Sequence, residues 1–220
     1  MTGRIRYTLL TDGPFDQVLK YPIEWLLENI AGVEFDGEWA NPDIFEGRAR
    51  RLADRIPQAL KYYPCDLLFI HRDAERDPRT RRTQEIHRAL QLCRSTLPAV
   101  CIVPVRMTEA WLLFNETVIR SAAGNPNGMV HLDLPSIRKI EQVVNPKKRL
   151  SEVLVAASER KGRSKKRFQR DLPISMHRIA ELINDFSPLR NLSAFRAFEK
   201  ELAGVLKENG WAMPSSTLQH

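Results

Sequence analysis

A short apolar run that ends abruptly in a charged loop constrains the fold more than any other feature. Residues 67–70 have the length and aliphatic content of a buried strand, and charged side chains crowd the loop at 71–78. In parallel α/β sheets, ligands bind in the crevice at the carboxyl ends of the strands. The run therefore predicts a buried strand with a candidate site directly after it.

Three further segments have strand character and alternate with helical patterns. Strands are predicted over 4–11, 33–39 and 99–105, the second with only weak alternation of apolar and polar residues. Apolar residues recur at helical spacing over 15–30, 42–62 and 80–93. Strand and helix in alternation predict an α/β fold, a parallel sheet with helices on its faces.

The chain changes character after a loop rich in Gly, Asn and Pro at 122–135. We expect an α/β core over residues 1–125 and a helical, basic C-terminal part over residues 126–220. Within the second part, helices are expected at 137–144, 147–157, 174–183 and 194–209.

Positive charge is concentrated in one segment. The chain has a net charge of +7, and residues 145–170 hold ten basic side chains against two acidic ones, so the remainder is about neutral. Such a local field is typical of a surface that binds a polyanion such as nucleic acid. A solvated, flexible surface run is the alternative. The candidate contacts to a phosphate backbone are Lys147, Lys148, Arg163, Lys165, Lys166 and Arg167.

Other features limit the class of protein. An apolar content of 43% in 220 residues is ample for a core, but no apolar run reaches the roughly 18 residues of a membrane span. The N-terminus lacks the apolar core of a signal peptide, so we expect a cytoplasmic protein without a membrane partner. The cysteines, Cys65, Cys93 and Cys101, are odd in number and lie in apolar surroundings, which favours reduced core residues over disulfides or a zinc site.

Acidic residues follow three of the predicted strands. Asp12, the pair Asp73 and Glu75, and Glu109 each come just after the end of a different strand, so a parallel sheet would bring them to one edge. Two carboxylates one residue apart repel each other unless a cation lies between them. Carboxylate oxygens are the ligands that magnesium, or manganese in its place, prefers.

Each acid also has a structural explanation. Glu109 falls in the first turn of a predicted helix with Thr108 as N-cap, where the helix dipole favours an acid. His71 is expected to be a structural hydrogen-bond donor rather than a catalytic base. In the same way, the loop acids could form surface ion pairs with the neighbouring Arg72, Arg76 and Arg79.

Several of these segments together resemble a known family. Asp12-Gly13-Pro14-Phe15-Asp16, Asp73-Ala74-Glu75-Arg76-Asp77 and Thr108-Glu109-Ala110-Trp111-Leu112-Leu113 are similar to motifs of a TOPRIM-like family of bacterial proteins of unknown function. The later Asn145-Pro146-Lys147-Lys148 and residues 188–195 are similar to it as well, so the resemblance spans most of the chain. The segment around Trp111 is its most specific part.

This resemblance implies a TOPRIM-like parallel sheet sandwiched by helices, with a helical C-terminal extension. It also implies a magnesium-dependent nuclease related to the overcoming-lysogenization-defect nucleases, acting with an ATPase partner in bacterial antiviral defence. By the resemblance, Asp12 is the general acid or base, Asp73 and Glu75 hold the metal, and Glu109 is a further acid beside it.

The chain departs from the family pattern at two of these positions. The first acid in TOPRIM domains is usually glutamate, where this chain has Asp12, and the second acid of the metal pair is usually aspartate, where it has Glu75. A non-catalytic subunit that binds nucleic acid or an ATPase partner is therefore the alternative. A phosphotransfer domain is a third reading, but the sequence has no P-loop.

Overall fold

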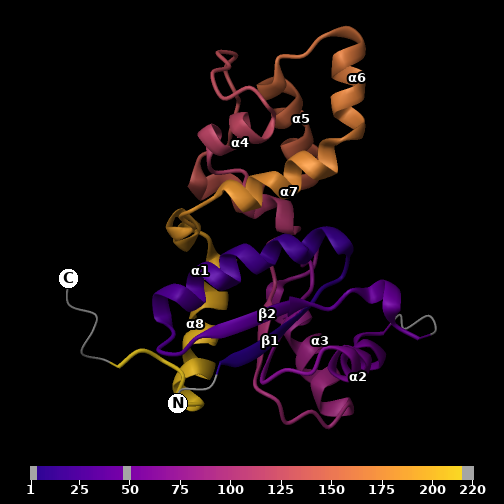
Figure 1. Cartoon of the computed structure of the whole chain (residues 1–220), viewed down its shortest axis with the longest axis vertical. Coiled ribbons are helices and arrows are strands. Elements are labelled where there is room, and N and C mark those ends of the chain that lie inside the picture. The colour runs from indigo at the N-terminus through magenta and orange to yellow at the C-terminus, as the bar shows by residue number, and fades with distance from the viewer. Residues whose placement is uncertain (1–3, 47–50, 215–220) are drawn as a thin grey trace. The chain divides into compact units, whose positions relative to one another are not determined.

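The computed structural model of the chain describes residues 4–46 and 51–214. Its contacts divide it into two compact units (Figure 1). Unit 1 runs to Arg72, resumes over Asp77–Val103 and takes up the chain again from Arg196. Unit 2 comprises Asp73–Arg76 and Pro104–Phe195. None of the helices in the described ranges combines the length and apolarity that a membrane crossing requires.

Unit 1 is built on a four-stranded parallel sheet, which confirms the predicted α/β class. The strands are β1 (Ile5–Leu10), β2 (Phe35–Trp39), β3 (Leu67–His71) and β4 (Ala99–Ile102), in the order β2-β1-β3-β4. Every residue of β3 is buried, as expected of a central strand covered on both faces. The segment with weak alternation forms β2, a strand at the edge of the sheet. Its residues alternate between half-exposed and exposed, and none of them is buried.

Helices cover both faces of this sheet. Helix α1 (Lys20–Ile30) and the C-terminal helix α8 (Ser193–Glu208) lie on one face, where the Tyr7 hydroxyl donates to Glu24 and the rings of Phe69 and Phe198 meet edge to face at 6.2 Å (Figure 1). Helices α2 (Leu52–Tyr62) and α3 (Arg79–Leu92) lie on the other. The sheet of unit 1 is thus the middle layer of three.

Local chemistry adjusts several predicted boundaries. The helix expected over 15–30 begins as a 3-10 helix, η1 (Pro14–Leu19), so Pro22 lies in the first turn of α1, where a missing N–H costs little. The helix expected over 42–62 is instead a 3-10 turn, η2 (Pro42–Ile44), and α2, with residues 47–50 outside the described ranges. The last strand ends at Ile102 because Pro104 follows it.

Close backbone approach requires glycine at two positions of unit 1. A Cβ atom on Gly37 of β2 would lie 1.9 Å from the Tyr7 ring, and one on Gly32 would lie 2.8 Å from the carbonyl oxygen of Ala212. At the second position the C-terminal segment pairs with the end of α1: Gly32 donates to Trp211, and Ala31 and Ala212 form an antiparallel bridge. These contacts attach residues near the C-terminus to the α/β unit.

Unit 2 is helical. The rings of Trp111 and Phe195 pack edge to face at 5.2 Å in its core, so Trp111 is a core residue as its helical spacing indicates. Asn115 and Asn145 cap α4 and α5 through their side chains. Its helices are η3 (Thr108–Leu112), α4 (Glu116–Ala122), η4 (Ile137–Gln142), α5 (Pro146–Ser158), α6 (Gly162–Arg170), α7 (Leu172–Leu182) and η5 (Ser187–Asn191).

This division differs from the expected boundary between residues 125 and 126. Residues 104–125 belong to the helical unit, and residues from Arg196 onward belong to the α/β unit. The apolar stripe of α8 explains the second difference, since Phe198 is fully buried against the sheet residue Phe69. The chain therefore leaves the α/β unit after β4 and returns to it through α8.

Candidate functional site

Two loops that follow adjacent strands are joined by backbone hydrogen bonds in unit 2. Ala74 donates to the carbonyl oxygen of Pro104 at 3.3 Å, and Glu75 donates to that of Arg106 at 2.9 Å. The first loop follows β3 and the second follows β4, and these strands are paired in the sheet. The predicted acids after the two strands are therefore carried on neighbouring backbone segments.

Asp73 lies at the N-terminus of the 3-10 helix that carries Glu109. Its Oδ1 atom accepts the backbone N–H of Thr108 at 3.1 Å. The prediction that Thr108 caps this helix is wrong: Met107 is the N-cap residue, and it makes no side-chain cap hydrogen bond. The Asp73 carboxylate, from the loop after β3, accepts an N–H that has no partner within the helix. This N–H belongs to Thr108, the residue directly before Glu109.

Glu109 is almost fully buried, with its side chain 5% exposed. A buried carboxylate is stable only where positive charge or hydrogen-bond donors compensate its lost hydration. The Nζ atom of Lys147, at the start of α5, lies 3.9 Å from it. Lys147 was predicted as a phosphate contact, and the structure brings it to one of the predicted acids.

Glu75 is exposed and has a left-handed backbone, with φ of 52°. Arg106, whose carbonyl accepts from Glu75, also has positive φ, 65°. This conformation costs a non-glycine residue about 1–2 kcal/mol, so two such residues at one hydrogen bond indicate that the tertiary structure imposes the loop shape. Strained backbone of this kind is common where side chains are held for binding.

Asp12 belongs to unit 1, where arginines surround its carboxylate. Arg72 Nε lies 2.9 Å from Oδ2 and Arg55 Nη1 lies 3.6 Å from Oδ1. Burial lowers the pKa of the Arg55 guanidinium; Asp12 opposes this shift, and Arg72 adds to it. Arg55 was not among the predicted site residues, because an arginine within the helical pattern of α2 carries no local signal that would single it out.

Two of the three arginines expected as alternative partners of the loop acids, Arg72 and Arg79, pair with other acids. Arg72 also pairs with Glu85 at 2.8 Å, and Arg79 pairs with Glu201 at 3.3 Å. His71 is buried with Nδ1 3.6 Å from Asp16 Oδ2, which also accepts the N–H of Gly13. The structural role expected of His71 stays a prediction.

The basic segment forms parts of two helices, and its acids have defined structural contacts. Glu159 accepts the N–H groups of Met129 and Val130 at 2.6 and 3.0 Å, and chiefly the bond from Val130 holds its pKa below the usual value. Glu152 lies 3.9 Å from Lys148 and 3.7 Å from Arg149. The excess positive charge therefore falls on α6.

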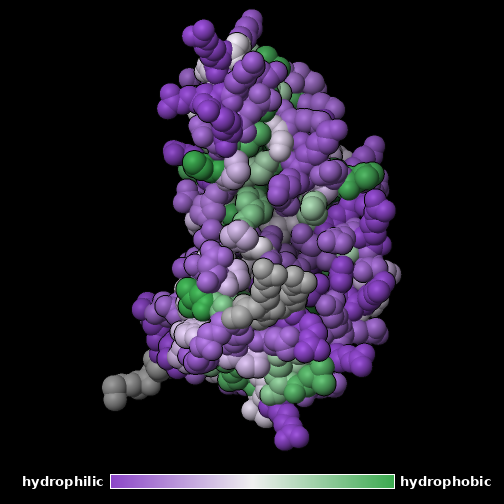
Figure 2. All heavy atoms as spheres, turned by 90° about the vertical axis from the view of Figure 1, so that its right-hand side faces the viewer, coloured by the Kyte–Doolittle hydropathy of each residue, from purple (hydrophilic) through white to green (hydrophobic). Residues whose placement is uncertain are grey.

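Helix α6 exposes every residue except Phe168. The Phe168 ring is 3% exposed and lies 4.7 Å from the Arg160 guanidinium. In the described ranges, none of the predicted phosphate contacts on α6 forms an ion pair: Arg163, Lys165, Lys166 and Arg167. Figure 2 shows mostly hydrophilic side chains on this face, with scattered hydrophobic ones among them.

A groove of about 800 Å³ lies along α6 in unit 2. Its lining includes the cations Arg160, Lys161 and Lys165, the acids Glu152 and Glu159, and the apolar Val155 and Leu172. Backbone N–H groups hold Glu159, and Glu152 pairs with Lys148 and Arg149, so the cations that line the groove are not paired with these acids. A groove with these walls suits an anionic ligand that also has apolar surface.

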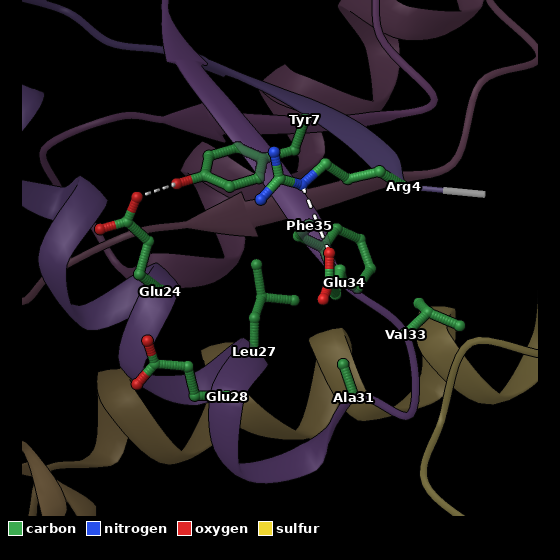
Figure 3. Close-up of a pocket in the computed structure, with 9 residues that line it drawn as sticks. All are labelled: Arg4, Tyr7, Glu24, Leu27, Glu28, Ala31, Val33, Glu34 and Phe35. Atoms are coloured by element: carbon green, nitrogen blue, oxygen red, sulfur yellow. Dashed lines mark hydrogen bonds and ion pairs between the residues drawn. The ribbon is translucent and has the colours of Figure 1, made fainter. Parts of the chain in front are cut away.

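A second cavity, of about 350 Å³, lies in unit 1 between α1 and the β2 edge of the sheet (Figure 3). Three glutamates line it, Glu24, Glu28 and Glu34; Glu34 pairs with Arg4 at 3.6 Å and Glu24 accepts from Tyr7 at 3.4 Å. None of the predicted site residues lines this cavity.

The acids of the two loops fit a hard divalent cation by their donor chemistry. Asp73, Glu75 and Glu109 offer carboxylate oxygens only, and Asp73 uses Oδ1 for Thr108. The structure thus carries these three acids on neighbouring backbone segments of unit 2, but within the described ranges their carboxylate oxygens do not all lie within 4.8 Å of one another. It holds Asp12 in unit 1 between two arginines.

No protein-family model, curated protein or solved structure matches the chain.

Proposed function

We propose that this protein is a TOPRIM-like, magnesium-dependent nuclease that hydrolyses phosphodiester bonds. One observation carries the proposal: the Asp73 carboxylate accepts the backbone N–H of Thr108, next to Glu109, so the two loops that carry these acids after adjacent strands are held together. The parallel sheet and the strained loop at Glu75 and Arg106 also support it.

In this proposal Asp73, Glu75 and Glu109 hold the metal. Bound magnesium, or manganese in its place, polarises a phosphate oxygen and lowers the pKa of a coordinated water. The resemblance assigns proton transfer to Asp12, whose carboxylate is oriented by Arg72 and Arg55. Lys147 compensates the charge of buried Glu109.

The cations of α6 bind the nucleic-acid backbone without reading its sequence. Arg163, Lys165, Lys166 and Arg167 are exposed and form no ion pair with the rest of the described chain, so they are available to phosphates. By the resemblance, the biological setting is antiviral defence together with an ATPase partner, in the cytoplasm.

The substitution Asp73→Asn tests the catalytic proposal. Asparagine keeps an oxygen that can accept the Thr108 N–H but removes the negative charge, so the loop is preserved while the metal loses a ligand. We expect magnesium-dependent cleavage of single- and double-stranded DNA and RNA to fall at least about 100-fold. The same substitution at exposed Asp43, in η2, is the matched control.

Rates are compared over a magnesium titration, with circular dichroism as the check of folding. Cleavage by Asp73→Asn at the wild-type rate, or equal loss in Asp43→Asn, contradicts the assignment of the metal site.

A non-catalytic nucleic-acid-binding subunit is the second candidate. Two observations favour it, because they give the acids positive charge without a metal. Asp12 lies between two arginines, and Glu109 has Lys147 as a neighbour. This candidate predicts salt-sensitive binding that does not require magnesium, and no cleavage at any magnesium concentration. Following binding and cleavage in one titration separates the two functions.

A further inference from the structure

Three side chains of the kinds that bind metal ions meet in unit 1, and none of them is among the acids discussed above. His87 lies on α3, Cys101 on β4 and Glu201 on α8. One ligand atom from each lies within 4.8 Å of the other two. These residues are far apart in sequence, and the cluster exists because α8 returns to the α/β unit.

The edge of the sheet explains how the cluster is held. Strand β4 is an edge strand, so its outward N–H groups have no neighbouring strand, and Cys101 donates its N–H to Glu201 Oε1 at 2.8 Å. Arg79 Nη2 lies 3.3 Å from the other carboxylate oxygen. Cys101 is 1% exposed whereas His87 is exposed, so the thiol is fixed in the core and the imidazole opens to solvent.

The spacing of sulfur and nitrogen matches a tetrahedral zinc centre. Zinc binds thiolate at about 2.3 Å and imidazole at about 2.0–2.1 Å, which puts the two ligand atoms about 3.6 Å apart at a tetrahedral angle. The distance between Cys101 Sγ and His87 Nε2 is 3.6 Å. A hydrogen bond between the Cys101 thiol and the His87 imidazole would have a similar length, so it is the alternative explanation of this distance.

We propose that His87, Cys101 and Glu201 form a zinc site with an open fourth position. Zinc bonds to the Cys101 sulfur as the thiol proton passes to solvent, and it takes the lone pair of neutral His87 and one carboxylate oxygen of Glu201. A thiolate ligand excludes magnesium, so this site is independent of the proposed nuclease centre.

The Cys101 thiol must lose its proton when zinc binds. Burial, with the nearby Glu201 carboxylate, raises the pKa of Cys101 far above the usual value for cysteine. Because zinc binds cysteine as the thiolate, each zinc that binds to the Cys101 thiol releases one proton.

Isothermal titration of the full chain with zinc chloride tests the proposal. In two buffers of different ionisation enthalpy, we expect one zinc and one released proton per chain. Cys101→Ser and His87→Ala should each weaken binding by more than the roughly 10–100-fold that loss of an outer-shell partner causes. Cys93→Ser is the matched control, because its thiol contacts the Ala53 carbonyl and lies outside the cluster.

Cobalt(II) provides a readout that a hydrogen bond cannot give. The cobalt-loaded wild type and Cys93→Ser should show thiolate-to-cobalt charge-transfer absorption, and Cys101→Ser should not. His87→Ala, at an exposed position, keeps the test decisive if Cys101→Ser fails to fold. Wild-type zinc affinity in His87→Ala, no zinc binding by the wild type, or cobalt spectra without the thiolate band overturns the proposal.

Discussion

At the scale of single residues, Tyr7 shows most clearly how the fold changes the chemistry of a side chain. It is 2% exposed, and the absence of a Cβ atom at Gly37 leaves room for its ring. Its hydroxyl donates to Glu24 at 3.4 Å (Figure 3). Burial first, and then the Glu24 charge, raise the pKa of the phenol well above its usual value.

Stability should therefore fall in alkali through Tyr7. The unfolded chain releases the phenol proton near its ordinary pKa of 10.0 while the folded chain keeps it, so this contribution is complete below pH 10 and is lost as the pH rises. We expect the free energy of unfolding to drop by about 1.4 kcal/mol per pH unit more steeply in the wild type than in Tyr7→Phe. Urea unfolding between about pH 9 and 12 measures this, and parallel curves would refute the assignment.

At the scale of elements, α6 is the segment for which the sequence left two readings. It is a helix with one buried side chain, Phe168, and the guanidinium of Arg160 lies over the ring of Phe168. Regular helical backbone gives its cations a fixed spacing. Exposed cations without acidic partners then become a surface for a polyanion rather than part of an internal ion-pair network.

Removing the charge of α6 should weaken nucleic-acid binding at every sequence. In a variant with Arg163, Lys165, Lys166 and Arg167 changed to glutamine, we expect the slope of log K against log salt to fall by roughly 3 to 4. Fluorescence anisotropy with labelled DNA and RNA over a salt series measures the slope.

Four exposed cations of unit 1 provide the control for charge alone. The matched variant changes Arg88, Arg196, Lys200 and Lys207 to glutamine. An equal loss of slope in both variants would mean that net charge, and not α6, governs binding.

At the scale of the whole molecule, the return of α8 decides how the chain is divided. Phe198 is 0% exposed and packs against Phe69 of β3, so residues near the C-terminus complete the core of the α/β unit. If residues 126–220 formed a separate helical part, as the sequence predicted, a substitution at Phe198 would not change the stability of the sheet.

Phe198→Ala should therefore destabilise the sheet. Loss of a buried phenylalanine costs about 3–5 kcal/mol, and we expect faster hydrogen exchange in β1 and β3. Phe186→Ala, at a buried position of unit 2, is the control and should act first on unit 2. Unchanged exchange in the strands of Phe198→Ala would contradict this role of α8.

The sequence predicted what local patterns can encode. The aliphatic run at β3 and the alternation of strand and helix predicted the parallel sheet, because burial on both faces requires such runs. It could not predict that Asp73 replaces Thr108 as the cap of η3, since a side chain from another loop supplies that bond. The arginines beside Asp12 were missed for the same reason.

By itself, then, the sequence determined the class of the sheet, the acids at the strand ends and the location of the positive charge, all properties of residues close together in the chain. The tertiary structure decided which of these residues meet. It joined the Asp73 and Glu109 loops, enclosed Asp12 between arginines, and brought Glu201 to Cys101 and His87. The physical reason is that contacts between distant segments depend on how whole elements pack, which no local pattern specifies.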